Sequence, residues 1–215
     1  MPRKKTFIIG DIHGCLGMLK RLMEKISWSP ERDNLIFLGD FIDRGENSKG
    51  VVDYILELGR LSSQVESLKG NHEAMFLDFL AGINRETFLV NGGWNTLESY
   101  GTCEPQEEGA VIPPGHRAFY ESLKLYIALE DYYVVHAGFR PGVDLGQQTE
   151  EDMTWIRKSF IYSNYNFGKK VIFGHTPFDE PLIMENKIGL DTGAVYGNKL
   201  TCLELPKVKF HSVEA

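Results

Sequence analysis

The first half of the chain alternates short apolar runs with stretches whose apolar residues fall at helical spacing. Each run, such as Phe7-Ile8-Ile9, ends beside glycine or polar residues, which is typical of a buried strand. The stretches between them repeat apolar residues every three or four positions, which predicts helices with one buried face. We therefore predict strands at 6–10, 34–39 and 65–69, and helices at 15–26, 48–59 and 71–80. This alternation favours right-handed βαβ units around a mainly parallel sheet.

The second half is richer in strands. Residues 126–130 and 132–136 flank Asp131 and predict a hairpin, and Asn186 marks a second tight turn. Further strands are predicted at 170–173, 182–185, 187–190 and 200–205. So many strands in 215 residues suit two sheets packed face to face with helices outside. The predicted fold is α/β, a four-layer αββα sandwich of two mixed sheets flanked by helices.

The chain shows no repeat, low-complexity tract or linker, so residues 1–215 are expected to form one domain. Its most irregular stretch, residues 101–115, carries three prolines and three glutamates. We interpret it as a surface excursion within that domain and not as a boundary. It could shape access of the substrate.

Composition narrows the class of protein. Apolar residues make up 42% and charged residues 25%, which are ordinary globular values, and the net charge of −7 argues against nucleic acid or an anionic membrane as partner. No apolar run reaches about 18 residues, the length of a transmembrane helix, and the basic N-terminus precedes only three apolar residues. We expect a cytoplasmic protein. Three widely spaced cysteines imply neither a thiolate zinc site nor a disulfide framework.

Polar side chains follow five predicted strands. Ligands of open α/β sheets bind outside the carboxyl ends of the strands, so these segments are expected to meet at one edge. They contain four of the six histidines, whereas His116 and His211 lie elsewhere and receive no role. The segments are Gly10-Asp11-Ile12-His13-Gly14, Gly39-Asp40-Phe41-Ile42-Asp43-Arg44-Gly45, Gly70-Asn71-His72-Glu73, His136-Ala137-Gly138 and Gly174-His175-Thr176.

Each segment alone has an ordinary explanation. A Gly-Asp pair is usually a turn, a lone histidine is usually structural, and an Asp-Arg pair is usually a surface ion pair. Five such segments at one sheet edge make coincidence the poorer explanation. Carboxylate, amide and imidazole donors without thiolate suit manganese, iron or zinc. Six candidate ligands exceed the need of one tetrahedral ion and suffice for two ions that share Asp40.

The ordered set of motifs resembles the signature blocks of the phosphoprotein phosphatase (PPP) family within the calcineurin-like metallophosphoesterases. The resemblance covers residues 7 to about 205. The first block alone is shared by many metallophosphoesterases, but the set with Asp43-Arg44 and His72-Glu73 is highly specific. Three further blocks resemble the compact bacterial and phage branch of the family: Phe88-Leu89-Val90-Asn91-Gly92-Gly93, Trp155-Ile156-Arg157 and Asp191-Thr192-Gly193-Ala194-Val195.

The resemblance implies two divalent ions, with manganese ahead of iron and zinc. Asp11 and His13 would bind the first ion and Asp40 would bridge both. The second ion would be completed by Asn71, His136 and His175. A hydroxide bridging the ions would attack phosphorus directly, without a phospho-enzyme.

The resemblance also implies roles in proton transfer and phosphate binding. His72 would protonate the leaving group as general acid, and Asp43 would orient it. Arg44 would bind phosphate oxygens, together with Asn71 and a second arginine. That second arginine is Arg157 by resemblance, with Arg140 as rival, and each has a surface role as alternative. Asn91 would shape the substrate pocket, although an Asn-Gly turn is an equal alternative. Glu73 follows the acid, and a helix-start carboxylate explains it at least as well.

The resemblance favours a metal-dependent Ser/Thr-type protein phosphatase, acting on a phosphorylated protein or on a small phosphoester, with phosphotyrosine among the accepted groups. The alternative is a symmetrical bis(5'-nucleosyl)-tetraphosphatase. That branch typically lacks the aspartate at position 43 and has a longer C-terminal half. A remote alternative is a non-catalytic phosphate-binding protein, which we would expect to have lost ligands or the acid. The sequence indicates neither the oligomeric state nor the native substrate.

Overall fold

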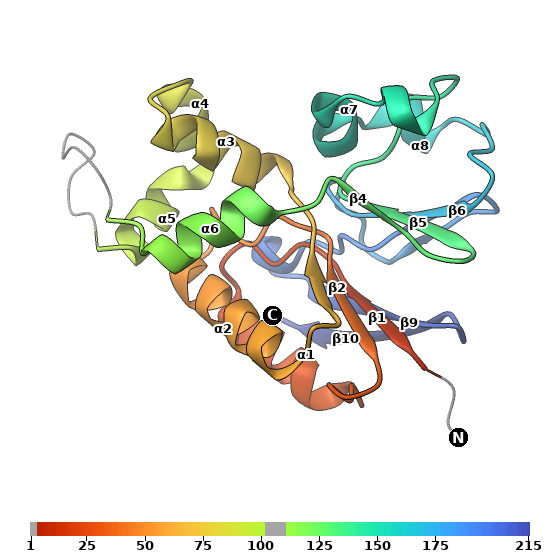
Figure 1. Cartoon of the computed structure of the whole chain (residues 1–215), viewed down its shortest axis with the longest axis horizontal. Coiled ribbons are helices and arrows are strands. Elements are labelled where there is room, and N and C mark those ends of the chain that lie inside the picture. Colours follow the sequence, from red (N-terminus) through yellow and green to blue (C-terminus); the bar gives the residue numbers. More distant parts are fainter. Residues whose placement is uncertain (1–3, 102–110) are drawn as a thin grey trace.

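Two five-stranded sheets lie face to face in the computed structural model, which describes residues 4–101 and 111–215 (Figure 1). The first sheet has the order β10-β9-β1-β2-β3 and the second the order β4-β5-β6-β8-β7. The first sheet comprises β1 (Thr6–Ile9), β2 (Asn34–Phe37), β3 (Val65–Ser67), β9 (Lys199–Leu205) and β10 (Lys209–Glu214). The second comprises β4 (Tyr126–Ala128), β5 (Tyr132–Val135), β6 (Lys170–Phe173), β7 (Leu182–Ile183) and β8 (Lys187–Gly189).

Both sheets are mixed. In the first, β1, β2 and β3 run parallel, and β9 pairs antiparallel with β1 and β10. In the second, β5, β6 and β8 run parallel, and β4 and β7 are antiparallel edge strands. The parallel strands therefore present their carboxyl ends to loops, as the predicted site requires.

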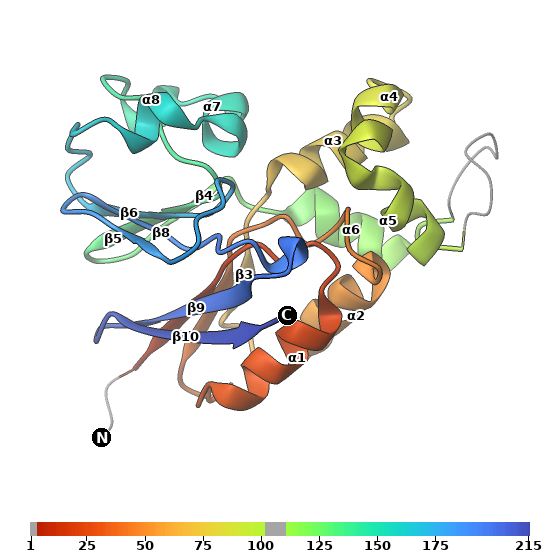
Figure 2. The same cartoon turned by 180° about the vertical axis from the view of Figure 1, so that it is seen from behind.

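Helices cover the outer face of each sheet, which gives four layers and confirms the predicted fold class (Figure 2). The longer helices are α1 (Leu16–Lys25), α2 (Ser48–Leu61), α3 (Asn71–Leu80) and α6 (Pro114–Ser122). The shorter ones are α4 (Arg85–Phe88), α5 (Trp94–Ser99), α7 (Glu150–Trp155) and α8 (Lys158–Ile161). Single turns lie at η1 (Leu89–Gly93), η2 (Leu145–Gln147) and η3 (Ala194–Tyr196). None of the helices in residues 4–101 and 111–215 is long and apolar enough to cross a membrane.

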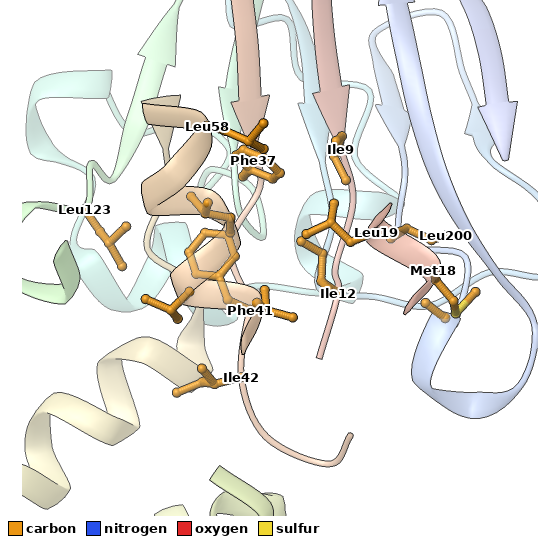
Figure 3. Packing of buried hydrophobic residues seen from close by; sticks show 14 of the residues in the cluster. Ile9, Ile12, Met18, Leu19, Phe37, Phe41, Ile42, Leu58, Leu123 and Leu200 are labelled. Carbon is orange, nitrogen blue, oxygen red and sulfur yellow. The ribbon is translucent and has the colours of Figure 1, made fainter. Parts of the chain in front are cut away.

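Three buried clusters fill the spaces between the layers. The alternation of side chains along β1 divides the strand between two of them: Phe7 and Ile9 pack toward α1 and α2, and Ile8 packs between the sheets. Figure 3 shows the helix-side cluster, in which Leu19 lies near Ile9 and Phe41 lies below Phe37. A third cluster, including Phe160 and Phe173, packs α8 against the second sheet. Apolar burial of this kind is the main stabilising term of the fold.

The structure corrects three expectations. Strand β10 was not predicted, because its alternating and half-buried side chains give a weak signal at a sheet edge. The predicted excursion at 101–115 extends too far, because Pro114 and Gly115 already belong to α6, where a proline suits the first turn. Its residues 102–110 lie outside the described part of the chain. Helix α6 and the short helices α4, α5, α7 and α8 were also unpredicted.

Candidate active site

The five predicted segments meet at the carboxyl ends of β1, β2, β3, β5 and β6. At three of these ends a residue proposed as a metal ligand adopts a left-handed backbone: φ is 45° at His13, 50° at Asp40 and 65° at His175. Such conformations are strained for side chains other than glycine and cluster at functional sites. Close approach explains two glycines here. A Cβ on Gly70 would lie 2.1 Å from the Asp40 carboxylate, and one on Gly174 would lie 2.1 Å from that of Asp11.

The first group of ligand-type atoms surrounds one side of Asp40. The Nε2 atom of His13 lies 3.5 Å from Asp40 Oδ2, and its Nδ1 is 2.8 Å from the carbonyl oxygen of Ile42. Because Arg44 donates to His13 Nε2 over 2.8 Å, Nδ1 carries the proton and donates it to Ile42. The lone pair of Nε2 therefore accepts from Arg44 in this structure, and a metal ion bound by His13 would take the place of Arg44 at this atom.

The second group lies on the other side of Asp40. The Nε2 atom of His136 lies 3.5 Å from Asp40 Oδ1 and 3.2 Å from Asn71 Oδ1, and its Nδ1 is 2.9 Å from the carbonyl of Leu38. His175 completes a cluster with Asp40 and His136 whose ligand atoms all lie within 4.8 Å of one another. The backbone N–H of His175 donates to Asp11 Oδ2 over 2.9 Å, which ties the two groups together.

The electrostatics separate one histidine from the other three. Burial lowers the pKa of His13 to about 3 and that of His175 to about 2, and it also lowers the pKa of His136. Burial acts the same way on His72, but Asp40 and Asp43 outweigh it and raise the pKa of His72. The pKa shifts therefore favour the neutral, metal-binding form of three imidazoles and the protonated form of the fourth.

The pKa values of Asp40 and Asp11 are shifted in opposite directions, although burial raises both. Burial alone would raise the pKa of Asp40, but the surrounding histidines, His136 foremost, hold it far below its usual range. Burial, Asp191 and Asp40 together raise the pKa of Asp11. A cation between these groups would relieve the repulsion between Asp11 and its acidic neighbours.

Among the side chains proposed as metal ligands, two buried atoms lack a hydrogen-bond partner within the described residues, namely Asp11 Oδ1 and His175 Nε2. Unpaired buried polar atoms are costly and require an explanation. Both belong to groups proposed as metal ligands, and a divalent cation is the partner that their lone pairs fit. The side chains present are therefore suited to hold divalent metal on either side of Asp40.

His72 and Asp43 form a buried pair beside the first group. Nδ1 of His72 donates to Asp43 Oδ2 over 2.5 Å, and His72 Nε2 has no protein partner among the described residues. Asp43 is itself fixed, since Thr96 Oγ1 donates to its Oδ1 over 2.6 Å and its backbone N–H donates to Thr96 Oγ1 and Ser48 Oγ. One buried imidazole nitrogen of the pair is thus left without a protein partner, and His72 has a ring nitrogen within 4.8 Å of ligand atoms of His13 and Asp40.

Glu73 joins two segments of the site. One carboxylate oxygen accepts from the backbone N–H groups of Asp40 and Gly70, over 2.8 and 2.9 Å, and the other accepts from Phe41 over 2.8 Å. Burial and the charge of Asp40 raise the pKa of Glu73 to about 8, against the lowering by these amides. The interpretation of Glu73 as a helix-start carboxylate is therefore incomplete, because Glu73 stabilises the left-handed Asp40 turn as well as the start of α3.

Comparison with known proteins agrees with this geometry. The sequence model of the calcineurin-like phosphoesterase family matches residues 4–209. The chain belongs to the calcineurin-like phosphoesterases. A bis(5'-nucleosyl)-tetraphosphatase PrpE (asymmetrical) of Bacillus thuringiensis strain Al Hakam is 30% identical to it, over 97% of this chain and 94% of the relative. A PrpE of Geobacillus sp. strain WCH70 is also 30% identical over the same shares.

Two solved structures share the fold of this phosphoesterase. One is described as a putative diadenosine tetraphosphatase; it has a TM-score of 0.78 and 24% identity, covering 100% of this chain and 95% of that one. The other is a Saccharomyces cerevisiae protein serine/threonine phosphatase with similarity to human phosphatase PP5. It has a TM-score of 0.67 and 16% identity, covering 100% and 81% of the two chains. The PPP-like resemblance is consistent with these neighbours.

The phosphoesterase presents two arginines near the metal-ligand groups. Arg44, half-buried, contacts His13 and lies 5.7 Å from the ring centre of Tyr196. Arg157 is exposed, and its charge adds to the lowering of the His136 and His175 pKa values that burial begins. Arg140 instead forms an ion pair with Asp152, 2.7 Å away. Of the two rivals, the structure therefore places Arg157 toward the site.

Asn91 lies in the η1 turn, and its side chain donates to the carbonyl of Thr87 over 2.8 Å. This contact fits the structural alternative. The next residue has a φ of 96°, and its carbonyl accepts from the backbone N–H of Arg44 over 3.1 Å. The turn thus supports Arg44, and a direct role of Asn91 in the substrate pocket stays a prediction.

Three residues of the phosphoesterase site were missed in the sequence. Thr96 and Ser48 hold Asp43, yet they follow no motif that marks them. Asp191 is buried, and its pKa is raised to about 6 by burial and by Asp40, while the backbone N–H of Gly193 and the two arginines lower it. The sequence feature that could have indicated Asp191 is its place in a family-like block after a strand, two residues before Gly193, whose φ is 69°.

Proposed function

We propose that this chain is a metal-dependent Ser/Thr-type phosphoprotein phosphatase, which also accepts phosphotyrosine and small phosphomonoesters. The observation that carries the proposal is the division of the four site histidines. Burial lowers the pKa of three of them, and only the pKa of His72 is raised, by Asp40 and Asp43. A separate proton donor matters most when the leaving group is an alkoxide, as in phosphoserine, because that group leaves poorly without a proton.

Two divalent ions, manganese first, would be held by Asp11, His13 and Asp40 on one side and by Asp40, Asn71, His136 and His175 on the other. When bound, they would supply a nucleophile derived from water and would neutralise charge developing on the phosphoryl group. The donor set of carboxylate, amide and imidazole supports this choice of metals. The partnerless Asp11 Oδ1 and His175 Nε2 support the two positions.

The protein side chains would then act on the substrate in three ways. Arg44 and Arg157 bind the non-reacting phosphate oxygens, for which the planar guanidinium is well suited. His72 Nε2 donates its proton to the departing oxygen, and Asp43 stabilises the position and tautomer of the imidazole. The strained turns at Asp40 and His175 keep these groups in place before substrate binds.

A second candidate function is cleavage of a dinucleoside tetraphosphate. This candidate is favoured by the relatives that are 30% identical over 97% of the chain, which are named bis(5'-nucleosyl)-tetraphosphatases. That name specifies asymmetrical cleavage, whereas the alternative drawn from the sequence was the symmetrical branch, which typically lacks the aspartate at position 43. A phosphoanhydride releases a nucleotide phosphate, which is a better leaving group than an alkoxide. The His72–Asp43 pair would therefore contribute less to this reaction.

The test compares substrates whose leaving groups differ. Manganese-loaded protein, with a chelator control, is assayed for kcat/KM on a phosphoserine peptide, p-nitrophenyl phosphate and diadenosine tetraphosphate. His72→Asn should retain metal and lower turnover of the peptide about 10²–10⁴-fold, with much smaller losses on the other two substrates. His116→Asn is the matched control, because His116 is also a buried histidine paired with an aspartate, Asp53, but lies on α6.

Two outcomes would count against the leading proposal. Equal losses on all three substrates would remove His72 as the acid. A wild-type preference of tenfold or more for the dinucleotide would favour the second candidate, and the products then identify the bond. Adenosine triphosphate with adenosine monophosphate indicates asymmetrical cleavage, and two adenosine diphosphates indicate symmetrical cleavage.

A further inference from the structure

A cavity of about 660 Å³ is lined by Arg44, the same residue that contacts His13. It is bounded by the start of α1, the loop after β2 and the residues around η3. Its volume falls within the range of small-molecule sites, about 300–1,000 Å³. We call it the α1 cavity; its lining includes Gly17, Lys20, Arg21, Arg44, Asn47 and Val195.

The lining of the α1 cavity is more basic than the protein as a whole. The whole chain carries a net charge of −7, yet the cavity is lined by Lys20, Arg21 and Arg44 against the side chain of Glu46 and the end of the chain at Ala215. Gly17, Lys20 and Arg21 are three and four positions apart, so they share one face of α1. Among the described residues, and apart from the backbone of α1 itself, only Nη1 of Arg21 lies within 4 Å of a Cβ built on Gly17, at 3.9 Å, so the missing side chain leaves this face open.

The start of helix α1 adds further positive potential. Its N-cap, Cys15, makes no side-chain capping bond, and its first turn contains no acidic residue. The first-turn N–H groups of a helix carry partial positive charge and favour phosphate. Gly14, Cys15 and Leu16 line the cavity, so this uncapped end belongs to it. The cavity therefore joins a helix end with three cationic side chains.

Arg44 connects the α1 cavity to the metal-ligand groups. Its guanidinium donates to His13, lies over the ring of Tyr196 and also lines the cavity. An anion with one phosphate beside His13 and Asp40 can therefore extend past Arg44 to Lys20 and Arg21 without leaving positive surroundings. A substrate with a single phosphate would not reach these two residues.

We propose that the α1 cavity binds the phosphate chain of a nucleoside polyphosphate beyond the phosphorus that reacts. This inference rests on the phosphohydrolase activity proposed above and defines the substrate class that its second candidate requires. Closely spaced phosphates match a helix end and an arginine fork better than the separated carboxylates of an acidic peptide do. Lys20 and Arg21 then determine specificity, while the groups around Asp40 perform the reaction.

The experiment measures inhibition of p-nitrophenyl phosphate hydrolysis by manganese-loaded protein. Diadenosine tetraphosphate inhibits by competition whether or not it is cleaved, and orthophosphate occupies only the reacting position. In the variant with both Lys20→Ala and Arg21→Ala, the ratio of the dinucleotide inhibition constant to the orthophosphate constant should rise about tenfold. Gly17→Glu, which adds a carboxylate to the cavity, should raise the same ratio.

Lys25→Ala is the matched control. Lys25 and Arg21 each donate from α1 to a backbone carbonyl of β10, of Ser212 and Glu214 respectively, but Lys25 does not line the cavity. Its removal should leave the ratio unchanged, and this separates the cavity from general effects of charge or helix anchoring.

An unchanged ratio in the double variant would overturn the inference. So would a selective loss for an acidic phosphopeptide, which would assign the cavity to peptide recognition. If the wild-type protein does not hydrolyse p-nitrophenyl phosphate, the proposed function fails. Calorimetric titration with diadenosine tetraphosphate still tests the cavity in that case, with a roughly tenfold weaker affinity expected in the double variant.

Discussion

The two sides of Asp40 are built in different ways. On one side, His136 is held by the carbonyl of Leu38, and His175 by its own strand end and the carboxylate of Asp11. On the other side, His72 depends on Asp43, which in turn depends on the hydroxyls of Thr96 and Ser48. The first arrangement is anchored mainly in the backbone and the second mainly in side chains. We call them the ligand side and the proton side.

This difference separates metal binding from proton transfer. Backbone anchors persist as long as the strands are paired, so the ligand side is inseparable from the fold. Side-chain anchors can be removed one at a time while the sheet stays intact. Substitutions on the proton side should therefore change the dependence on leaving group and pH, whereas substitutions at Asp40 should remove all activity.

The largest effect is expected for Asp40→Asn. The substitution keeps the shape of the side chain but removes the charge that the two proposed metal positions share, so metal binding should weaken at both. Turnover of every substrate should fall about 10³-fold or more, because several kcal/mol of charge stabilisation depend on the metals. Elemental analysis of the purified protein should show metal lost from both positions.

Asp53→Asn serves as the control for Asp40→Asn. Asp53 is a carboxylate on α2 that pairs with Lys49 and His116, away from the strand ends. Full metal content in the Asp40 variant would show that the two metal positions do not share this residue.

Asp43→Asn should come next, with a loss that depends on the substrate. Without the carboxylate, His72 loses both orientation and the interaction that raises its pKa, so turnover of a phosphoserine peptide should fall about 10²-fold. The metal content should stay unchanged. Activity should fall as pH rises, because His72 loses its proton. Since the variant lowers the pKa of His72, this fall should move to lower pH. A fall at the same pH as in wild type would contradict the pairing.

The ligand side was largely predictable from the sequence. His136 follows a short apolar run directly and His175 follows one after a single glycine, and the carboxyl ends of parallel strands meet at one edge of a sheet. That rule placed Asp11, Asp40 and Asn71 as well, although they come from the other sheet. Residues within four positions of the end of a strand can thus be assigned from the sequence pattern.

The support of the proton side could not be predicted in the same way. Thr96 lies in α5 after the turn at Gly92, where φ is 96°, and the preceding residues have no clear apolar period. Ser48 opens a helix predicted correctly, but nothing in its neighbourhood indicates that its hydroxyl contacts Asp43. Contacts between such distant helices depend on tertiary packing, which local sequence pattern does not encode.

Glu73→Gln sharpens the comparison from the position where the two sides meet. The carboxylate accepts three backbone N–H groups, and an amide would turn its NH₂ toward at least one of them. We expect the free energy of unfolding to fall by about 1–3 kcal/mol and metal affinity to weaken about tenfold. Thermal unfolding and metal titration measure the two effects. If stability falls and metal affinity does not, Glu73 supports the start of α3 without positioning Asp40.

The smallest effect is expected for Thr96→Val, which removes one hydroxyl from the proton side and nearly preserves the side-chain volume. Asp43 Oδ1 then loses its 2.6 Å hydrogen bond, while its backbone N–H keeps Ser48 Oγ as acceptor, 3.1 Å away. Stability should fall by about 1–3 kcal/mol, because a buried carboxylate oxygen is left without a donor. The phosphoserine to p-nitrophenyl phosphate ratio of kcat/KM should fall only a few-fold, since His72 still donates to the other oxygen. Ser99→Ala, which removes a hydroxyl from the same helix without touching Asp43, is the control. A drop in the ratio as large as that of Asp43→Asn would mean that Thr96, and not the bond between Asp43 and His72, sets the orientation of the acid.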